Sequence, residues 1–366
     1  MKWVWQNKNW PNFEFDANKT VAFETIFVQN SGKIIGAIEH LAKDNTDILK
    51  VELLSQEAIS TSNIEGEILN RDSVQSSIRK HLGLKTDFKK IPANAAGVSE
   101  MMVEVYLNFD KPLTHDTLFE WHKMLMNGRR DVASIGNYRQ HEEPMQIVSG
   151  NFNNSKIFYE APPSENIMLE MERFLMWYNE KLSDNSYSTL IFAAVTHLFF
   201  EMIHPFEDGN GRIGRALVEK AISQRLKTPS LNSFASVIDK EKKEYYNAIQ
   251  GCNTSLNINK YLQYFANLIL KSQEYSIKVV SFLIFKTKFI MKFNSLINER
   301  QEKVLARIFE QGIEGFKGGL SAGNYKTITG TSNATATRDL LELLQMNALI
   351  KTGELKSTRY HLNTDI

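Results

Sequence analysis

The segment from His204 to Arg215 concentrates side chains that can do chemistry in one short stretch, HPFEDGNGRIGR. His204 supplies an imidazole, which titrates near neutral pH and can therefore act as a base. Asp208, four residues later, supplies a carboxylate of the kind that Mg²⁺ accepts beside phosphate groups. The histidine also ends the apolar helix before it, because Pro205 restricts the residue that precedes it. A base and a metal ligand are therefore expected in the turn that follows a helix.

Glycines and arginines in the same stretch favour the binding of an anion. Gly209 and Gly211 let a ligand approach the backbone closely, and N–H groups at the start of the next helix can form an anion nest. Arg212 and Arg215 are three residues apart and share a face of that helix. Both can reach an anion at its N-terminus with the bidentate geometry that suits phosphate. Base, metal ligand, nest and arginines together indicate phosphoryl or nucleotidyl transfer.

Each of these features also has an ordinary structural explanation. A histidine after an apolar helix is more often structural than catalytic, and a Gly-Asn-Gly sequence is more often only a turn. Two arginines on one helix face usually form a solvated surface. Structure alone does not require all three features in one short window, so their combination favours the functional interpretation.

This stretch resembles the signature of the Fic family, HPFx[DE]GNGRxxR, at every specified letter. The resemblance implies a protein adenylyltransferase, which moves AMP from Mg-ATP to a Ser, Thr or Tyr hydroxyl of a target protein while pyrophosphate leaves. It implies that His204 deprotonates the hydroxyl, that Asp208 holds Mg²⁺ on the phosphates and that Phe206 anchors the loop. The residues that it implies for phosphate binding are Gly209, Asn210, Gly211, Arg212 and Arg215.

Two further segments resemble parts of the same family. Gly136-Asn-Tyr-Arg139 is followed by a predicted β-hairpin, with strands at 145–148 and 156–159 and a turn at 149–155. In the family such a hairpin is a flap, which holds the modifiable segment of the target as an added strand. Tyr245 and Tyr246 lie where relatives place aromatic residues beside the adenine, and two core aromatics on a helix would explain them equally well.

A segment near the N-terminus, Thr61-Ser-Asn-Ile-Glu-Gly66, resembles the inhibitory motif of the family, [ST]xxxE[GN]. The resemblance implies that Glu65 pairs with Arg215 and occupies the place of the γ-phosphate, so that ATP binds only in a non-productive pose. The residues alone predict a helix that ends near Gly66, which is a good C-terminal glycine. A rival interpretation makes Ser62 and Glu65 a capping box that begins a new helix.

The elements that must position these residues are mainly helical. Apolar residues recur at spacings of three and four over 21–41, 48–64, 167–178, 190–203, 214–226 and 258–270. The expected fold class is therefore mainly α, with a helical Fic core, a short β-hairpin flap and a C-terminal winged-helix domain. We expect domains at 1–93, which carries the inhibitory motif 61–66, at 94–295, the catalytic core with flanking helices, and at 296–366, the winged-helix-like module.

The tail predicts three helices and a hairpin, which is the winged-helix order. The helices are expected at 299–310, 321–327 and 332–346, and the hairpin at 349–362 with its turn at Gly353. Between Leu296 and Ile366 nine Lys/Arg face eight Asp/Glu, which leaves a net charge of +1. Proteins that read DNA usually show a basic footprint. DNA binding and protein docking therefore stay equally open for this module.

The bulk composition excludes some classes of protein. The chain has 366 residues, 42% hydrophobic and 23% charged, and a net charge of +1, so it carries no global attraction to nucleic acid or membrane. Its single cysteine, Cys252, excludes a disulfide within the chain and favours the cytoplasm. The longest apolar run, 190–203, falls short of the ~20 apolar residues of a membrane-spanning helix and predicts a buried core helix.

Two other functions stay open from the sequence. The same site could remove AMP from a modified protein if Glu65 orients a water molecule, and the chain could be a DNA-binding regulator whose Fic core senses nucleotide. The expected partners are ATP and a target protein. DNA at the C-terminal module and a second copy of the chain, as a homodimer, are further partners that the sequence leaves open. No membrane is expected.

Overall fold

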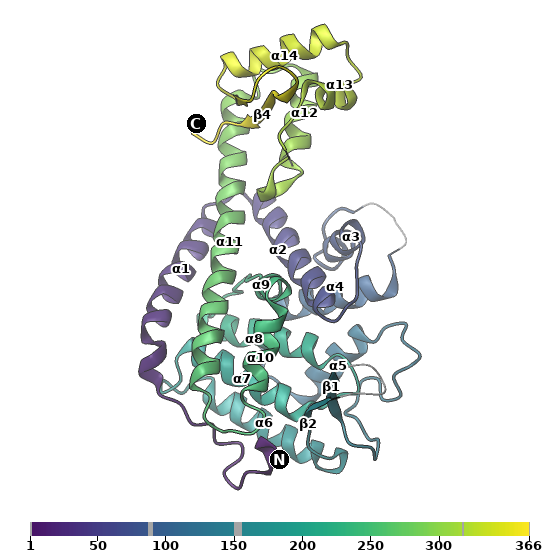
Figure 1. The fold of residues 1–366 in the computed structure, drawn as a ribbon, viewed down its shortest axis with the longest axis vertical. Coiled ribbons are helices and arrows are strands. Elements are labelled where there is room, and N and C mark those ends of the chain that lie inside the picture. The colour runs from purple at the N-terminus through teal and green to yellow at the C-terminus, as the bar shows by residue number, and fades with distance from the viewer. Residues whose placement is uncertain (1, 87–90, 150–155, 317, 366) are drawn as a thin grey trace. The chain divides into compact units, whose positions relative to one another are not determined.

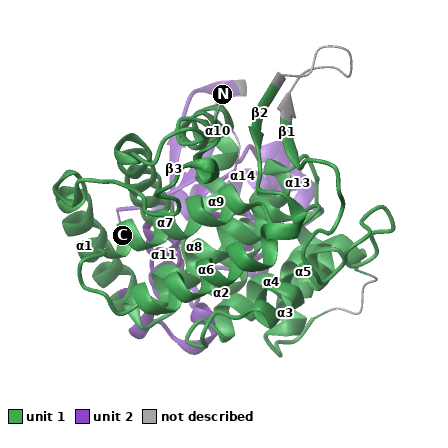
Figure 2. Ribbon diagram, turned by 90° about the horizontal axis from the view of Figure 1, so that it is seen from below, with its two compact units in different colours: residues 1–36, 50–276 green, residues 37–49, 277–366 purple. Residues whose placement is uncertain are grey.

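The computed structural model describes residues 2–86, 91–149, 156–316 and 318–365. Fourteen α-helices and two pairs of short antiparallel strands lie in this part of the chain (Figure 1). The mainly helical fold class predicted from the sequence is therefore confirmed. The chain divides into two compact units, residues 1–36 with 50–276 and residues 37–49 with 277–366 (Figure 2). The predicted domain limits at 93/94 and 295/296 stay a prediction.

Most helices belong to the larger unit, and the division between the units falls within α1, α2 and α11. The order along the chain is α1 Val21–Glu39, α2 Lys43–Ile64, α3 Arg71–His81, α4 Ala93–Leu107, α5 His115–Leu125, α6 Ile167–Lys181, α7 Thr189–Ile203, α8 Asn210–Leu226, α9 Phe234–Lys240, α10 Lys242–Gln250 and α11 Asn259–Phe293. Short 3₁₀ turns lie at Val4–Gln6, Ala17–Thr20 and Ser164–Asn166.

Helices α7 and α8 form the centre of the larger unit and pack on each other. Helix α7 begins after Ser188, whose hydroxyl accepts a hydrogen bond from the N–H of Ile191. Every residue from Leu190 to Ile203 is buried, as the apolar run predicted. Helix α8 begins directly after the glycine turn, at Asn210. The signature loop is thus held at both ends by the most buried helices of the unit.

The predicted hairpin is present as strands β1 Gln146–Ser149 and β2 Lys156–Glu160. The strands are antiparallel, and an irregularity in register lies between Ile147 and Val148. The predicted turn at 149–155 lies outside the described residues, except for Ser149.

The smaller unit contains the helices and the hairpin that were predicted for the tail. They are α12 Glu299–Phe309, α13 Ala322–Thr329, α14 Asn333–Gln345, β3 Leu349–Thr352 and β4 Arg359–Leu362, with 3₁₀ turns at Gly312–Glu314 and Leu355–Ser357. Leu320 pairs with Tyr360 and extends the hairpin by one bridge. Val304, Leu340 and Leu349 lie in the buried core of this unit. Its assignment as a winged helix stays a prediction.

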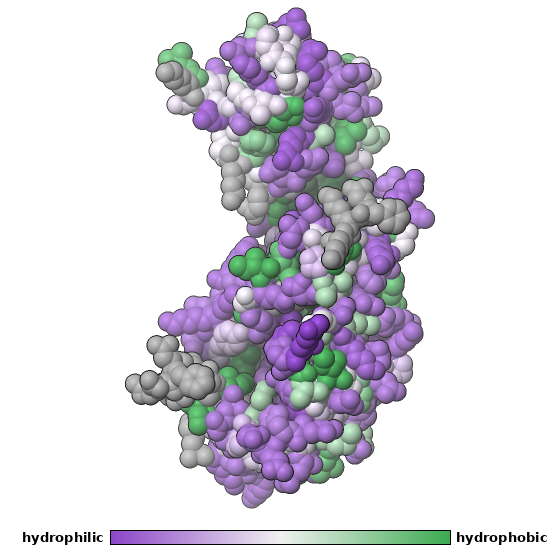
Figure 3. Space-filling view, turned by 90° about the vertical axis from the view of Figure 1, so that its right-hand side faces the viewer, coloured by the Kyte–Doolittle hydropathy of each residue, from purple (hydrophilic) through white to green (hydrophobic). Residues whose placement is uncertain are grey.

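The surface drawn in Figure 3 is mostly hydrophilic, and its hydrophobic residues gather in small separate patches. Among the described residues, no helix combines the length and the apolar character that crossing a membrane requires.

Candidate active site

The loop between α7 and α8 has a constrained backbone that begins at His204. This residue adopts a left-handed conformation with φ 51°, which is unfavourable for a side chain with a Cβ. Arg139 holds the conformation, because its Nε donates to the carbonyl of His204 and its backbone N–H donates to the carbonyl of Pro205, both at 2.9 Å. Its remaining guanidinium nitrogens donate to Ser164 and to the carbonyl of Pro162. The buried arginine therefore fixes where the histidine lies.

The imidazole of His204 is in its unprotonated form near neutral pH. Burial, and then the charge of Arg139, lower its pKa from the usual value near 6.5 to about 4, so the ring is neutral at pH 7. Within the described part of the chain its Nδ1 has no hydrogen-bond partner. A neutral imidazole without a bound donor is available as a base.

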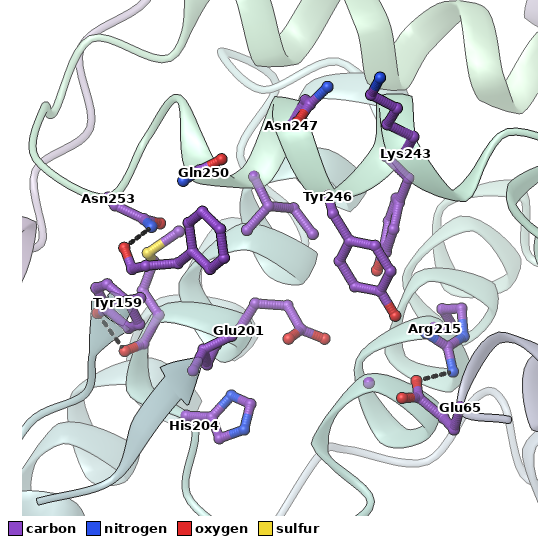
Figure 4. A pocket seen from close by; sticks show the side chains of 16 residues that line it. Glu65, Tyr159, Glu201, His204, Arg215, Lys243, Tyr246, Asn247, Gln250 and Asn253 are labelled. Carbon is purple, nitrogen blue, oxygen red and sulfur yellow. Dashed lines mark hydrogen bonds and ion pairs between the residues drawn. The ribbon is translucent and has the colours of Figure 1, made fainter. Parts of the chain in front are cut away.

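His204 lines a cavity of about 590 Å³ in the larger unit (Figure 4). This volume lies in the range of small-molecule sites in proteins. Figure 4 shows His204 on one side of the opening and Arg215 with Glu65 on another, and Tyr246 extends between helix α10 and the ion pair. The cavity thus brings together the predicted base, the second predicted arginine and both predicted aromatic residues, Tyr245 and Tyr246.

The glycine turn at the start of α8 is locked by a side chain of its own. The amide of Asn210 accepts from the N–H of Phe206 at 2.9 Å and donates to its carbonyl at 2.8 Å. Phe206 is fully buried and stacks on His122, with ring centroids 4.2 Å apart. Gly209 has a positive φ of 85°, which a glycine adopts without strain. The side chain of Asn210 therefore stabilises the turn from its inner side, and the backbone of the turn remains available to contact a ligand.

Gly211 opens the space into which the acidic residue of the N-terminal motif reaches. A Cβ at this position would collide with Oε1 of Glu65 and would lie 3.1 Å from a guanidinium nitrogen of Arg215. An anionic group can therefore contact the helix backbone and an arginine at the same time. In this structure that anionic group is the carboxylate of Glu65.

Glu65 forms the ion pair that the sequence predicted. Its Oε1 lies 2.7 Å from a terminal nitrogen of Arg215, which is only 1% exposed. The same guanidinium donates to the hydroxyl and to the carbonyl of Thr61, at 2.7 and 3.0 Å. Burial alone would lower the pKa of Arg215, but Glu65 and Tyr245 raise it overall, so the group stays charged.

The rival capping-box interpretation of this segment is wrong. Ser62 lies inside helix α2, which continues to Ile64. The next helix, α3, begins at Arg71 and is capped by the side chain of Asn70. Glu65 therefore lies just beyond the end of a helix, followed by Gly66 with a φ of 82°. This geometry matches the helix end that the glycine predicted.

The first signature arginine also has carboxylate partners. Arg212 contacts Asp208 and Glu67, in each case with an N–O distance of 3.3 Å. The other oxygen of Asp208 lies 2.8 Å from Arg129. Burial would raise the pKa of Asp208, but Arg212, the N–H of Gly209 and Arg129 lower it overall, so the carboxylate is ionised.

The donor set around Asp208 fits a magnesium ion that is shared with phosphates. The described residues hold no group of three or more His, Cys, Asp or Glu side chains arranged for a metal. Mg²⁺ often binds through one or two carboxylates and completes its shell with phosphates and water. Asp208 can supply that carboxylate once its arginine contacts are exchanged. The neighbouring Glu207 accepts a hydrogen bond from the N–H of Ala133 and is engaged elsewhere.

The two predicted tyrosines differ in exposure. Tyr245 is 1% exposed, and its hydroxyl bonds to Nε2 of His197 at 2.8 Å, so it belongs mainly to the core. Tyr246 also lines the cavity and is 46% exposed. His197 is structural in these contacts, because its Nδ1 meets the hydroxyl of Tyr261. Of the two rings, Tyr246 is the one that a ligand can reach.

Several residues of the site were not found from the sequence. Glu67 and Arg129 contact the signature side chains, and the carboxyl of Glu201 lines the cavity. Burial, the largest influence, raises the pKa of Glu201 to about 7, and its Oε1 has no hydrogen-bond partner among the described residues. A carboxylate two residues after Glu65 was visible in the sequence. The pairing of this residue, Glu67, with Arg212 could not be found from the sequence, because the two are 145 positions apart.

Comparison with known proteins adds family information to this geometry. Residues 112–222 match the Fic/DOC family, and residues 3–84 match a domain of unknown function, DUF4172. A protein adenylyltransferase Fic of Drosophila grimshawi is 27% identical over 135 residues, which cover 36% of this chain and 26% of that protein. A protein of the same name from Drosophila ananassae is 23% identical over 227 residues, 61% and 41% of the two chains.

A probable protein adenylyltransferase of Aquifex aeolicus is 32% identical over 92 residues, which are 25% of each chain. The matches thus span between a quarter and about two fifths of these relatives. A solved Fic family protein from Desulfovibrio desulfuricans superposes with a TM-score of 0.55 at 20% identity, over 96% of this chain and 98% of that one. A Fic domain containing signaling protein from Bacteroides thetaiotaomicron gives 0.52 at 18%, over 69% and 96%. These likenesses describe the fold.

Proposed function

Starting from the Fic domain that this chain contains, we propose that the protein is an adenylyltransferase that moves AMP from Mg-ATP to a Ser, Thr or Tyr hydroxyl of another protein. The observation that carries the proposal is one cavity that joins the neutral imidazole of His204 to an anion-binding helix start and the buried Arg215. Relatives named protein adenylyltransferase support the same reaction.

In the proposed reaction the acceptor hydroxyl oxygen attacks the α-phosphorus of ATP. His204 takes the hydroxyl proton, a bond forms from the acceptor oxygen to phosphorus, and the bond to the bridging oxygen breaks so that pyrophosphate leaves. The backbone at Gly209 and Gly211 and the side chains of Arg212 and Arg215 hold the phosphates by charge. Mg²⁺ on Asp208 would neutralise further phosphate charge. The ring of Tyr246 is available to contact the adenine of ATP.

The acceptor polypeptide is proposed to bind at the hairpin. Strand β2 contributes Phe158 and Tyr159 to the wall of the cavity, and β1 contributes Ile147. Ile147 and Ile157 are 39% and 44% exposed, so apolar side chains are available to a docked strand. Main-chain pairing to such an edge can hold a segment with little dependence on its sequence.

We also propose that the chain is autoinhibited. The carboxylate of Glu65 lies against Gly211 and on Arg215, which is the position that we assign to the γ-phosphate of ATP. A carboxylate and a phosphate compete for one guanidinium, so ATP cannot take its productive contact while Glu65 remains. The wild-type chain is then a weak enzyme until this segment moves.

The remaining parts of the proposal concern the surroundings of the enzyme. We propose that it is a cytoplasmic protein, because Cys252 is its single cysteine and cannot form a disulfide within the chain, and because thiols stay reduced in the cytoplasm. The C-terminal unit is interpreted as a winged-helix-like module that docks DNA or protein.

The proposal is tested by following the label of ATP. Wild-type, Glu65→Gly and Glu65→Gly/His204→Ala chains are each incubated with Mg²⁺, a host lysate and ATP labelled either at the α- or at the γ-phosphorus. Protein labelled from the α-position only, in the Glu65→Gly sample and not with the histidine variant, is the expected result. Label from the γ-position would identify phosphoryl transfer and reject the proposal. Release of AMP from modified proteins, without any gain of label, would identify hydrolytic removal of AMP instead.

A further inference from the structure

The β1–β2 hairpin depends on contacts at its base for its position. An isolated two-stranded hairpin is at best marginally stable in water. In this chain the hairpin is a sheet of its own, with no third strand among the described residues, and it projects from the larger unit (Figure 2). What holds it must therefore be found outside the sheet.

The register of the hairpin determines which backbone groups face outward. Ala161 donates its N–H to the carbonyl of Met145, so these two residues form a hydrogen-bonded pair. Hydrogen-bonded and non-hydrogen-bonded pairs alternate along an antiparallel ladder. The next pair, Gln146 with Glu160, therefore directs its backbone N–H and C=O groups away from the partner strand. Each strand thus has an outer edge with donors and acceptors that the partner strand does not use.

The outer edge of β2 is closed by the N-terminal segment. The carbonyl of Glu160 accepts a hydrogen bond from the indole of Trp5 at 2.7 Å. Two residues earlier on the same edge, the carbonyl of Phe158 accepts from the side-chain amide of Asn253 at 2.7 Å (Figure 4). Asn253 is tied in turn to the N-terminus, because its carbonyl accepts from the N–H of Val4 at 2.7 Å. These residues form one connected set of bonds.

The N-terminal segment also contacts the residue of β2 that faces the catalytic helix. The ring of Trp3 packs edge-on against Tyr159, with centroids 5.6 Å apart. The hydroxyl of Tyr159 donates to the carbonyl of Met202 at 2.6 Å, two residues before His204 (Figure 4). Tyr159 is only 2% exposed, so its position is set by these neighbours. The position of β2 relative to the base is therefore coupled to the first residues of the chain.

The outer edge of β1 differs from that of β2. Within the part of the chain that the structure describes, the outward N–H and C=O of Gln146 have no hydrogen-bond partner, and only its side chain is engaged, by Glu160. Because the outer edge of β1 is free and that of β2 is occupied, the two edges of the hairpin are not equivalent. An added strand can pair with β1 and cannot pair with β2 until the N-terminal segment leaves.

We propose that residues 3–5 are a brace that closes the outer edge of β2 and positions the hairpin, so that an acceptor polypeptide pairs with the edge of β1. The acceptor part rests on the proposed function, whereas the brace does not. In this proposal Trp5 does not touch the acceptor and instead positions the hairpin to which the acceptor binds. The proposal also gives a role to the first residues of the segment that matches a domain of unknown function.

The brace is tested by amide hydrogen exchange on the full chain. Trp5→Phe keeps an aromatic ring and removes the donor to Glu160. The matched control is Trp10→Phe, which removes an indole bond to Glu170, on α6 and not on the hairpin. We expect the amides of both strands to exchange about three- to tenfold faster in Trp5→Phe, the factor of one net hydrogen bond, while α7 and the control stay unchanged. Equal exchange in wild-type and Trp5→Phe chains, or equal acceleration in both variants, would overturn the brace.

The direction of acceptor binding is tested by two prolines on opposite edges. Gln146→Pro and Glu160→Pro each remove one outward N–H, and neither residue contributes a ladder bond to the other strand. Both are made in the Glu65→Gly background. We expect Gln146→Pro to lower AMP transfer to lysate proteins about three- to tenfold with unchanged ATP affinity, and Glu160→Pro, which keeps the carbonyl that accepts from Trp5, to lower it by a clearly smaller factor. The reverse order, or equal effects, would contradict pairing at β1.

These two experiments separate the inference from the proposed function. If no variant transfers AMP, the adenylyltransferase assignment fails, and hydrogen exchange still decides whether the brace exists. If transfer occurs and both prolines are neutral, the assignment survives and pairing at β1 is rejected. ATP binding, measured for every variant, shows that the cavity itself is intact.

Discussion

Replacing Glu65 with glycine should release the activity of this chain, and the structure allows the size of the gain to be worked out. The carboxylate lies 2.7 Å from the guanidinium of Arg215, which is 1% exposed, while the glutamate side chain is 33% exposed. A hydrogen bond to a charged group contributes about 1.5–3 kcal/mol. If the γ-phosphate takes over this contact, the rate of AMP transfer should rise roughly ten- to a hundredfold, since about 1.4 kcal/mol is a factor of ten. Solvent at the glutamate favours the lower end.

The assay is single-turnover transfer of α-labelled AMP to lysate proteins and to the chain itself. Glu65→Gln is the matched control for backbone effects, because it keeps the length of the side chain and removes its charge, and it should give a smaller gain. Adding Arg215→Ala should cancel the gain, because the freed guanidinium is what the variant exploits. A flat response to Glu65→Gly would refute the competition between carboxylate and phosphate. So would a gain that survives without Arg215.

Four other outcomes follow from the site. Glu67→Gln should raise ATP affinity severalfold, because it frees Arg212 from one carboxylate; calorimetry that gives an unchanged Kd would contradict this. His204→Ala should lower transfer by ~10²–10⁴-fold with ATP binding nearly intact, and a wild-type rate would exclude it as the base. Asp208→Ala should make the reaction largely insensitive to added Mg²⁺, measured as rate against metal concentration, and an unchanged dependence would exclude this ligand. Because burial lowers the pKa of His204 to about 4, the base form persists as pH falls, and the rate of the Glu65→Gly chain should stay level from about pH 8 to about pH 6; a midpoint near pH 6.5, the ordinary histidine value, would show that the ring is not shielded.

Much of the site could be predicted because its parts are contiguous. The residues that we propose as base, metal ligand and phosphate-binding turn lie within twelve positions, and one loop between two helices brings them together whatever the rest of the fold does. The long periodic helices were predictable for a similar reason, since apolar spacing is a local property. Glu65 was found because a motif marks it, and its pairing with Arg215 then required only that the helix before it pack on α8.

The parts that could not be predicted depend on contacts between distant segments. Arg139 lies 65 positions before the carbonyl that it holds, and Trp5 lies 155 positions before its partner on β2. Neither residue carries a pattern that names its partner. Trp3, Trp5 and Trp10 lie near the N-terminus, but a cluster of aromatic residues is more often core than function, and the proposed brace follows only from the register of the hairpin. The side-chain role of Asn210, which locks the turn, was also visible only in the structure.

The charges around the glycine turn place both arginines of the proposed phosphate site in contact with one segment. Arg212 and Arg215 are the cations that would meet the phosphates, and each is engaged by a glutamate of the same short segment, Glu67 and Glu65. Removing one glutamate frees one arginine and leaves the segment tied to the other. A signal that moves the segment as a unit would free both at once, so its effect on nucleotide binding should exceed that of either substitution. Because the same N-terminal region also holds β2 through Trp5, it acts on the phosphate site and on the hairpin through separate contacts. In the proposed enzyme the core and its N-terminal region are therefore expected to act together.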